Sequence, residues 1–371
     1  MRKLATIRKI DKIDPIPNRD VIGLAHIDGW NVIVNKNDFR VGDLCVYCEI
    51  DSMLPDKPEF EIIKKRSNLR IRTMKMAGAI SQGICFPLSI LPDGQYNIGD
   101  DVTDIMGVTQ YTGNMDIENE MLDKNKRKIK YPNFVMKIPF IRKLLLSKKE
   151  YKGFPDFIPK TDEPRIQNMP QVIDFANKNP NHKWHVHEKL DGQSGTFVCM
   201  RKKGLLRDSF EYMVCSRNLR LFQKDNRSYW KVSEKYNIKE RLVRYLKNNK
   251  NAKYICVQGE CIGDGVQKNK YQISGHDFYV FNVLSNDTDK NLLNNKFSEP
   301  DIDKFCDEYG FKRVPEVQNF EFSKMTMEDV IAFADGKSQI NKNAQREGIV
   351  VRDGSVSFKV ISNKFLLKYG E

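Results

Sequence analysis

The sequence lacks any apolar run long enough to cross a membrane. A transmembrane helix needs about 20 mostly apolar residues, and no stretch of the 371 residues approaches this. The N-terminus, MRKLATIRKIDKIDP, also lacks the apolar core of a secretory signal. The eight cysteines are irregularly spaced, which is typical of free thiols in a reducing compartment. These absences argue against a membrane partner and predict a cytoplasmic protein, with the nucleus left open.

Acidic residues are also in short supply. The chain has 62 Lys and Arg against 49 Asp and Glu, a formal net charge of +13. A basic excess of this size favours a polyanionic partner, most simply nucleic acid, although a solvated basic surface is the alternative. The length suits two to three domains of about 150 residues, each able to bury a core without disulfides.

Most of the excess charge lies in residues 124–152. This segment carries eleven Lys or Arg and one acid, Glu150. Four aromatic residues are interleaved with the cations: Tyr131, Phe134, Phe140 and Tyr151. Cations for phosphates and rings for stacking are how single-stranded nucleic acid is bound. An interdomain linker over residues 111–160, which is compatible with phosphate contact, is the main interpretation, and a nuclear-import signal is a further one.

Residues 1–110 have the pattern of a small β-barrel. Alternating strands such as WNVIV (30–34) and LCVYCEI (44–50) recur at roughly ten-residue spacing, with Gly, Pro and Asp between them. This pattern predicts an OB-fold. Its segment KKRSNLRIRTMK (64–75) is a second candidate for phosphate contact.

Residues 161–371 mix strands and helices. Helical periodicity appears at 171–178, 231–249 and 325–336, and six short strands follow KWHVHEKL (183–190). Tight turns between neighbouring strands predict an α+β fold built on antiparallel sheets. No internal repeat or low-complexity tract occurs in the sequence.

The string Lys189-Leu190-Asp191-Gly192 ends the first of these strands and carries the clearest chemical signal. It places an amine two residues before a carboxylate, followed by a glycine that permits a tight turn. The pattern alone is common, but five strings follow it in order: VCSRN (214–218), VQGECIGDG (257–265), DFYVFNV (277–283), REGIVVRD (346–353) and SFKVIS (357–362).

This ordered set resembles the covalent nucleotidyltransferases, and within them the ATP-dependent RNA ligases with an N-terminal OB domain. RIRTMKMAGAISQGICFPL (70–88) and GFPDFIPKTDEPRIQN (153–168) also resemble stretches of those ligases, so the likeness covers nearly the whole chain. The resemblance implies that Lys189 attacks the α-phosphate of ATP and that the protein seals 3′-OH and 5′-phosphate RNA ends. It implies RNA ends or a nicked duplex as partner, and we expect a monomer that works in RNA repair.

The resemblance also assigns roles to residues of this chain. Lys189, Asp191 and Lys359 are the expected catalytic residues, and Phe281 is expected to stack on adenine. The other expected nucleotide contacts are Glu188, Arg165, Arg217, Asn218, Glu260, Glu347, Lys359 and Lys364. Of these, Arg165 would reach the ATP phosphates, and Arg217 would hold the ribose or an RNA phosphate.

Chemistry explains these residue types. An attacking amine must be neutral, whereas a free lysine has a pKa of about 10.4. We expect Lys359 and a bound divalent cation to lower the pKa of Lys189. Asp191, Glu260 and Glu347 offer hard oxygen ligands for Mg²⁺ or Mn²⁺, which would neutralise charge on the α-phosphate.

The sequence departs from the family pattern at two places. Asn282 stands where the family often has Asp after the stacking Phe, and a second lysine is missing two residues after Lys359, where Lys364 or Lys368 would substitute. A DNA ligase and a GTP-using capping enzyme are the alternatives. In both, an OB domain usually follows the last motif, and only 12 residues follow Lys359. An RNA-binding protein with a decayed ligase domain is disfavoured because the motif residues are intact.

Two metal-like patterns are discounted. Cys45 and Cys48 form C-x-x-C within an alternating strand, where residues three apart point to opposite faces. His182, His185 and His187 have no Cys or carboxylate at ligand spacing, so zinc is disfavoured, although His185 and His187 share a strand face with Lys189.

Overall fold

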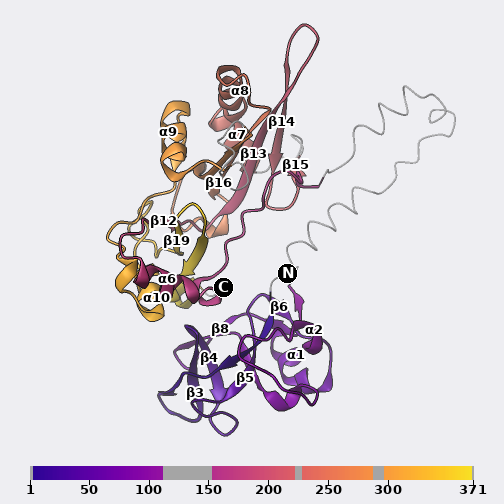
Figure 1. The fold of residues 1–371 in the computed structure, drawn as a ribbon, viewed down its shortest axis with the longest axis vertical. Helices are drawn as coiled ribbons and strands as arrows, with labels where there is room; N and C mark the ends of the chain where they lie inside the picture. Colours follow the sequence, from indigo (N-terminus) through magenta and orange to yellow (C-terminus); the bar gives the residue numbers. More distant parts are fainter. Residues whose placement is uncertain (1–2, 112–152, 222–227, 287–295, 370–371) are drawn as a thin grey trace, which may run out of the picture.

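The computed structural model describes residues 3–111, 153–221, 228–286 and 296–369 (Figure 1). The basic segment 124–152 and most of the expected linker at 111–160 lie outside these residues, so the predictions made for them stay predictions. In the described chain, no helix has both the length and the apolar character needed to span a membrane. We call residues 3–111 the N-terminal unit and residues 153–369 the C-terminal unit.

The N-terminal unit is built almost entirely of short strands, as the sequence predicts. Its strands are β1 (Ala5–Lys9), β2 (Lys12–Ile16), β3 (Arg19–Ile27), β4 (Trp30–Asn35), β5 (Leu44–Cys48), β6 (Ser52–Met53), β7 (Arg70–Ile71), β8 (Thr73–Met76), β9 (Ala79–Gln82), β10 (Ile84–Pro87) and β11 (Thr109–Gln110). Two short helices accompany them, α1 (Glu61–Ser67) and α2 (Thr103–Met106). Hydrogen bonds among these strands form four small sheets, β1-β5-β10, β2-β3-β4, β8-β9 and β11-β6-β7, rather than one continuous barrel.

Alternation of side chains explains how these strands make a core. In β4, Trp30, Val32 and Val34 are buried and the residues between them are half-buried. Tyr47 of β5 joins the same core, and its ring lies 5.8 Å from that of Trp30. The unit is therefore held by a conventional apolar core, since its three cysteines are all free thiols.

A six-stranded sheet forms the first lobe of the C-terminal unit. Its strand order is β15-β14-β13-β16-β17-β18, and every pairing is antiparallel except β17 with β18. The strands are β13 (Gln193–Lys202), β14 (Ser209–Cys215), β15 (Arg220–Leu221), β16 (Tyr254–Gly263), β17 (His276–Ser285) and β18 (Lys312–Arg313). Helices α7 (Ser228–Lys235), α8 (Ile238–Asn248) and α9 (Glu299–Tyr309) pack with Phe197, Cys199 and Val257 on one face of this sheet.

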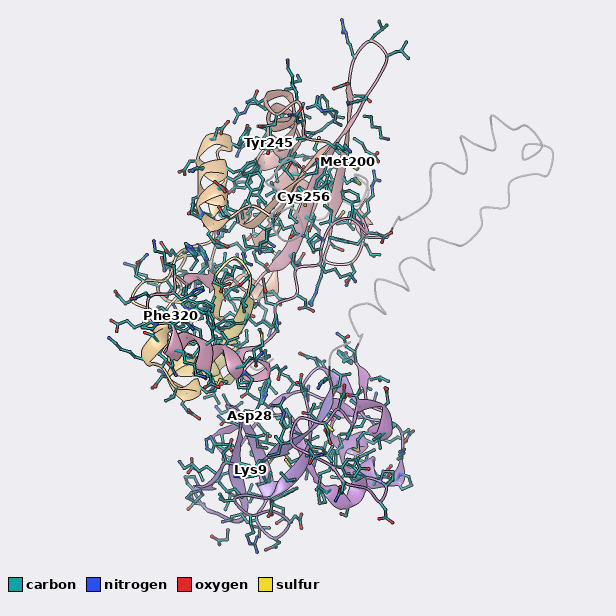
Figure 2. The ribbon with its side chains drawn as sticks, in the orientation of Figure 1. Lys9, Asp28, Met200, Tyr245, Cys256 and Phe320 are labelled. Atoms are coloured by element: carbon teal, nitrogen blue, oxygen red, sulfur yellow. The ribbon has the colours of Figure 1, made fainter. Side chains whose placement is uncertain are left out.

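A three-stranded sheet, β12-β19-β20, forms the second lobe. Its strands are β12 (His185–Lys189), β19 (Gly348–Arg352) and β20 (Ser357–Ile361), with helices α6 (Gln171–Lys178), α10 (Met327–Ala334) and α11 (Asn363–Tyr369) beside them. Figure 1 shows α6, α10, β12 and β19 grouped between the six-stranded lobe and the N-terminal unit. In Figure 2, Tyr245 and Cys256 mark the first lobe and Phe320 marks the second.

Comparison with the predicted elements shows which helices could be predicted from the local sequence pattern. The predicted helices at 171–178 and 325–336 correspond to α6 and α10. The helical stretch at 231–249 is two helices, because Asn237 between α7 and α8 adopts a left-handed conformation with φ of 47°. Helix α9 was not predicted, although Ser298 caps it and Pro300 lies in its first turn.

The two units contact each other through the end of the chain. Ile80 of β9 is buried with Ile361 and Leu366, which flank the start of α11. Gly29, next to the Asp28 labelled in Figure 2, lies so close to Met327 of α10 that a Cβ would fall 2.4 Å from it. The N-terminal unit is thus packed against α10, the end of β20 and α11.

Candidate active site

Strand β12 carries Lys189 to the junction of the two lobes. Lys189 pairs across the sheet with Gly348, so Glu347 at the start of β19 lies beside it. The Nζ atom of Lys189 donates to Oε1 of Glu347 at 2.6 Å, and both side chains are largely buried. Two sequence landmarks 158 residues apart are therefore joined directly.

Gly192 allows the motif to turn closely over β16. A Cβ at this position would lie 2.5 Å from the carbonyl oxygen of Cys261 and 2.9 Å from Cγ of Glu260. The backbone of Gly192 hydrogen-bonds to the Glu260 carboxyl group. Only a residue without a side chain permits this approach, which brings Glu260 into the electrostatic neighbourhood of Lys189.

Three carboxylates set the charge state of Lys189 in the ligand-free protein. Burial lowers the pKa of Lys189, but Glu347, Glu260 and Asp191 together outweigh burial and raise this pKa above its usual value. The lowering expected from Lys359 and a bound divalent cation stays a prediction, because without the cation three carboxylates act on the amine. Lys189 is held as an ammonium ion in the absence of substrate.

Two neighbours of Lys189 have pKa values that are shifted towards pH 7. Burial raises the pKa of Glu260 to about 8, although the ammonium of Lys189 opposes this. Burial, with the like charges of Lys189 and Arg165, lowers the pKa of Lys359 to about 8. Pairs of titratable groups displaced in this way are typical of catalytic centres.

Arg165 and Lys359 lie side by side. The backbone N–H of Lys359 donates to the carbonyl of Pro164 at 2.8 Å, which adds the chain before Arg165 to the edge of β20. Asp162 pairs with both Lys359, at 3.7 Å, and Arg217, at 2.7 Å. These contacts gather three of the predicted cations along one side of the site.

Phe281 and Asn282 follow each other on β17. Phe281 is half-buried and packs in the apolar cluster that contains Leu190, the residue after Lys189. The amide of Asn282 donates to Gln258 at 3.0 Å and accepts from Arg352 at 3.0 Å. An aspartate carboxylate could accept from Arg352 but could not donate to Gln258. The amide of Asn282 does both, which explains why this chain has Asn where the family often has Asp.

Two predicted contacts lie in other surroundings. Asn218 is in the turn between β14 and β15, which is closed by a hydrogen bond from the Ser216 N–H to the carbonyl of Leu219 at 2.8 Å. Lys364 is exposed on α11 and pairs with Asp335 at 3.7 Å. Their roles at the nucleotide stay predictions, and the contacts described give Lys364 no direct link to Lys189.

Two buried carboxylate oxygens are well suited to hold a ligand. Oε2 of Glu347 and Oε1 of Glu188 are buried and accept no hydrogen bond from the described residues. The other oxygen of Glu188 accepts from the backbone N–H of Gln339 at 2.7 Å. A buried acceptor without a donor is costly, so each fits an incoming cation or N–H group.

The predicted metal ligands are near one another but do not form a complete coordination shell by themselves. Within the described ranges, no three His, Cys, Asp or Glu side chains are gathered closely enough to hold an ion by themselves. Asp191 is paired with Lys270, and both side chains are less than a tenth exposed. Because Mg²⁺ usually keeps waters and takes only one or two carboxylates, Asp191, Glu260 and Glu347 stay predicted ligands, direct or through water.

Lys270 is a site residue that the sequence analysis missed. It follows three consecutive non-glycine residues with positive φ, Gln267, Lys268 and Asn269, and strain of this kind is typical of functional segments. The next residue, Tyr271, accepts the backbone N–H of Asp191 at 2.7 Å through its hydroxyl. The ammonium of Lys270 also lies over the rings of Phe365 and Tyr369 in α11, at 4.5 and 4.8 Å. No sequence pattern signals these contacts, which join residues about 80 positions or more apart.

Comparison with known proteins agrees with this arrangement. An OB-fold domain model matches residues 4–88, and the RNA ligase family model matches residues 182–369. The chain belongs to the RNA ligase family. Its N-terminal unit is accordingly an OB-fold domain, and its C-terminal unit carries the α+β ligase fold with largely antiparallel sheets, as predicted. A comparison with curated proteins finds no match.

Solved structures of the Naegleria gruberi RNA ligase resemble this RNA ligase over the whole chain. A lysine-to-methionine variant with AMP and Mn is 30% identical, with 99% of each chain covered and a TM-score of 0.74. A glutamate-to-alanine variant with ATP and Mn is also 30% identical, with 100% of each chain covered and a TM-score of 0.73. The same ligase with PPi is 30% identical, covers 99% of each chain and has a TM-score of 0.73.

Proposed function

We propose that this protein is an ATP-dependent RNA ligase that joins a 3′-OH to a 5′-phosphate through a lysine-AMP intermediate. One observation carries the proposal: the half-buried Lys189 lies beside the carboxyl groups of Glu347 and Glu260, at the junction of the two lobes. The Naegleria ligase, similar over the full chain, has been solved with ATP, AMP and PPi. The products are therefore AMP and pyrophosphate.

The first step makes a bond between Lys189 and the nucleotide. The ammonium of Lys189 gives up a proton to solvent, its Nζ attacks the α-phosphorus of ATP, and the bond to pyrophosphate breaks, so pyrophosphate leaves. Lys359 and Arg165 are positioned to balance the phosphate charge, and the half-buried Phe281 offers a face for the base. The orphaned oxygen of Glu188 suits an amino group of the nucleotide.

The later steps transfer AMP to RNA. The 5′-phosphate of the RNA displaces Lys189 from AMP, and the 3′-OH then attacks the activated phosphate and releases AMP. A divalent cation, Mg²⁺ or Mn²⁺, would be held by Asp191, Glu260 and Glu347 and would neutralise phosphate charge when bound. The orphaned Oε2 of Glu347 fits that role.

Partner, location and domain roles belong to the same proposal. We expect a monomer in which residues 1–110 and the basic linker 111–160 hold RNA ends or a nicked duplex, while residues 161–371 carry the adenylation site. All eight cysteines are free and buried, which supports work in the reducing interior of the cell, cytoplasmic or nuclear. RNA repair is the expected role.

Labelling with nucleotide tests the proposal. The protein is incubated with ATP or GTP labelled at the α-phosphate and with Mg²⁺ or Mn²⁺, and then with nicked duplexes carrying RNA or DNA on each side of the nick. We expect covalently bound AMP on the wild type, with the alkali stability and acid lability of a phosphoramidate, and none on Lys189→Ala, while the exposed neighbour Lys183→Ala labels normally. Preferential labelling by GTP would indicate a capping enzyme, and sealing of DNA alone would indicate a DNA ligase.

A further inference from the structure

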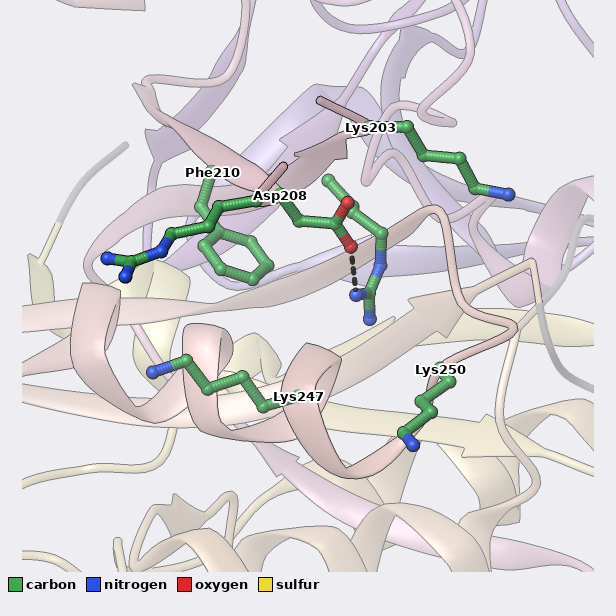
Figure 3. A pocket seen from close by; sticks show the side chains of 7 residues that line it. Lys203, Asp208, Phe210, Lys247 and Lys250 are labelled. Carbon is green, nitrogen blue, oxygen red and sulfur yellow. Dashed lines mark hydrogen bonds and ion pairs between the residues drawn. The ribbon is translucent and has the colours of Figure 1, made fainter. Parts of the chain in front are cut away.

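A hollow of about 420 Å³ opens between the β13–β14 hairpin and the end of α8, far from the sequence motifs (Figure 3). We call it the basic hollow. The residues that line it are Arg201, Lys203, Arg207, Asp208, Phe210, Lys247 and Lys250. Five cations thus face one carboxylate, and none of these residues takes part in the adenylation chemistry.

Among the described residues, four of the five cations form no ion pair with a carboxylate, although the charge of Lys203 helps to lower the pKa of Asp208. Asp208 accepts from Arg201 at 2.8 Å, drawn as the dashed line in Figure 3. The guanidinium of Arg201 also donates to carbonyl groups at the end of α8, including that of Asn249 at 3.2 Å. The role of Arg201 in the hollow is therefore structural, because it attaches the hairpin to α8. Among the described residues, no carboxylate lies within 4.0 Å of the remaining cations: Lys203, Arg207, Lys247 and Lys250.

The basic hollow also contains an aromatic face. Phe210 is half-buried, and the guanidinium of Arg201 lies 5.7 Å from its ring centre. The turn beside it is built tightly, because a Cβ on Gly204 would lie 2.2 Å from the carbonyl oxygen of Arg207. A ring set among unneutralised cations on a fixed hairpin is the combination that binds a base together with its neighbouring phosphates.

The basic hollow is separate from the adenylation site. Ser194 of β13 lies opposite Glu260, and Lys203 is nine residues further along the chain, a span of about 30 Å at 3.3 Å per residue. Arg201 shares the strand face of Phe197 and Cys199, which pack against the helices. Glu260 lies on the opposite face, because side chains alternate along a strand and Val257 and Cys261 face the helices.

We propose that the basic hollow is a second RNA-binding site, which holds phosphates of a strand away from the break and stacks one base on Phe210. The inference rests on the proposed RNA ligase function and extends it from the strand ends to the flanking RNA. RNA fits better than a metabolite because four cations in an open hollow match several phosphates rather than one. The site would select substrates with enough RNA beside the nick to reach around the edge of the sheet.

Removal of the four cations tests this proposal. Lys203, Arg207, Lys247 and Lys250 are replaced together by Gln, with Arg201 left in place to keep the hairpin attached to α8. A control variant loses four exposed lysines elsewhere in the same unit: Lys178, Lys183, Lys304 and Lys324. RNA binding is measured over a salt series, and sealing is measured on nicked duplexes with arms of about 6 and about 24 base pairs, since about 9 base pairs span 30 Å.

Expected results distinguish a specific site from general charge. The hollow variant should form AMP-lysine normally, seal long duplexes about tenfold more slowly and seal short ones as the wild type does. Its log–log salt slope should be shallower by about 3, since each lost phosphate contact removes about 0.7 to 0.9. Phe210→Leu should weaken RNA binding about fivefold or more with an unchanged salt slope, because only stacking is lost.

Other outcomes would overturn the inference. Equal losses in the hollow and control variants would mean that bulk charge attracts RNA, and equal losses on short and long duplexes would remove the distal site. The hairpin tip also exposes Leu205 and Leu206 almost completely. Binding of the hollow to vesicles of anionic lipid, with RNA binding unaffected, would assign it to a membrane surface. A wild type that seals no RNA would refute the proposed function itself.

Discussion

At the scale of single residues, the site is arranged as paired opposite charges. Glu347 holds Lys189, Asp191 is paired with Lys270, and Asp162 contacts Lys359. Pairing keeps buried carboxylates and amines from standing alone, which would cost several kcal/mol for each ion. The nucleophile is consequently stored in its charged form, and the residue displaced furthest towards losing a proton is Lys359 rather than Lys189.

The lowered pKa of Lys359 predicts a specific pH dependence. Below pH 8 its ammonium is charged and can attract ATP phosphate, and the charge is lost as the pH rises through about 8. The groups that face it are Lys189, Arg165, Asp162 and Glu347. Lys359→Arg keeps its charge at every accessible pH.

Comparison of the two proteins isolates this titration. Glu260 and Lys189 titrate in both proteins, so their effects cancel when kcat/KM for ATP of the wild type is divided by that of Lys359→Arg. Because kcat/KM reports the titration of groups in the free enzyme, this ratio should fall by up to about tenfold per pH unit above pH 8. AMP-lysine formation from pH 6 to 10 measures it. A ratio that stays constant would show that Lys359 does not titrate in this range.

The pair of Lys270 and Asp191 predicts a large effect on stability. Lys270→Met removes the ammonium that is paired with the buried carboxylate of Asp191, which should lower the free energy of unfolding by about 3 kcal/mol. The control is Lys64→Met, which breaks the exposed pair with Asp56 and should cost less than about 1 kcal/mol. Urea unfolding measures both.

A second substitution checks the cause of that loss. Asp191→Asn in the Lys270→Met background removes the carboxylate charge that has lost its Lys270 partner and should restore part of the lost stability. Lys270→Arg keeps the charge and should restore AMP-lysine formation better than Met does. An additive double variant would mean that the two residues do not interact.

At the scale of elements, the sequence predicts best what a local pattern can encode. Strands β12, β16, β17 and β19 form where the alternation places them. Lys189 ends β12, Glu260 and Phe281 lie within β16 and β17, and Glu347 immediately precedes β19. Helix α9 was missed although its buried apolar residues recur at helical spacing after the Ser298 cap: Ile302, Phe305, Cys306 and Tyr309. The parallel strand β18 was not predicted, because it has only two residues and depends on pairing with β17. The contact of Lys270 with Asp191 was also beyond prediction, since a strained loop brings it about.

The turn between β12 and β13 predicts a strict requirement for glycine. Gly192→Ala would place a Cβ 2.5 Å from a backbone oxygen of β16, so the turn must shift and the alignment of Lys189 with Glu260 is lost. We expect a loss of about 2 kcal/mol or more in stability and of most AMP-lysine formation. Gly153→Ala, where nothing lies within 4 Å of the new Cβ, is the matched control and should behave as the wild type. Normal labelling of the Gly192 variant would contradict the close approach.

At the scale of the whole molecule, the OB-fold unit is connected to the active site through two contacts. Arg165 lies next to Lys359 and its guanidinium is 5.5 Å from the ring of Trp30 in the N-terminal unit. Helix α11 packs against Ile80 through Leu366 and against Lys270 through Phe365. Docking of the N-terminal unit therefore supports both a predicted phosphate ligand and the partner of Asp191.

Separation of the two units should affect the reaction steps unequally. Ile80→Asp places a carboxylate between Ile361 and Leu366. Burying that charge should cost more free energy than separating the two units, so we expect the units to undock. AMP-lysine formation should fall only a few-fold, since every motif residue from 189 to 359 stays in the C-terminal unit. Sealing should fall more than about tenfold, because RNA is then held by units that no longer keep a fixed geometry.

Ile98→Asp, at an exposed position of the same unit, is the control and should change neither step. Gel assays of both steps, with small-angle scattering to detect undocking, measure the outcome. Equal losses in both steps would show that the N-terminal unit acts mainly on the nucleotide pocket, through Arg165 and α11, rather than as a clamp for RNA.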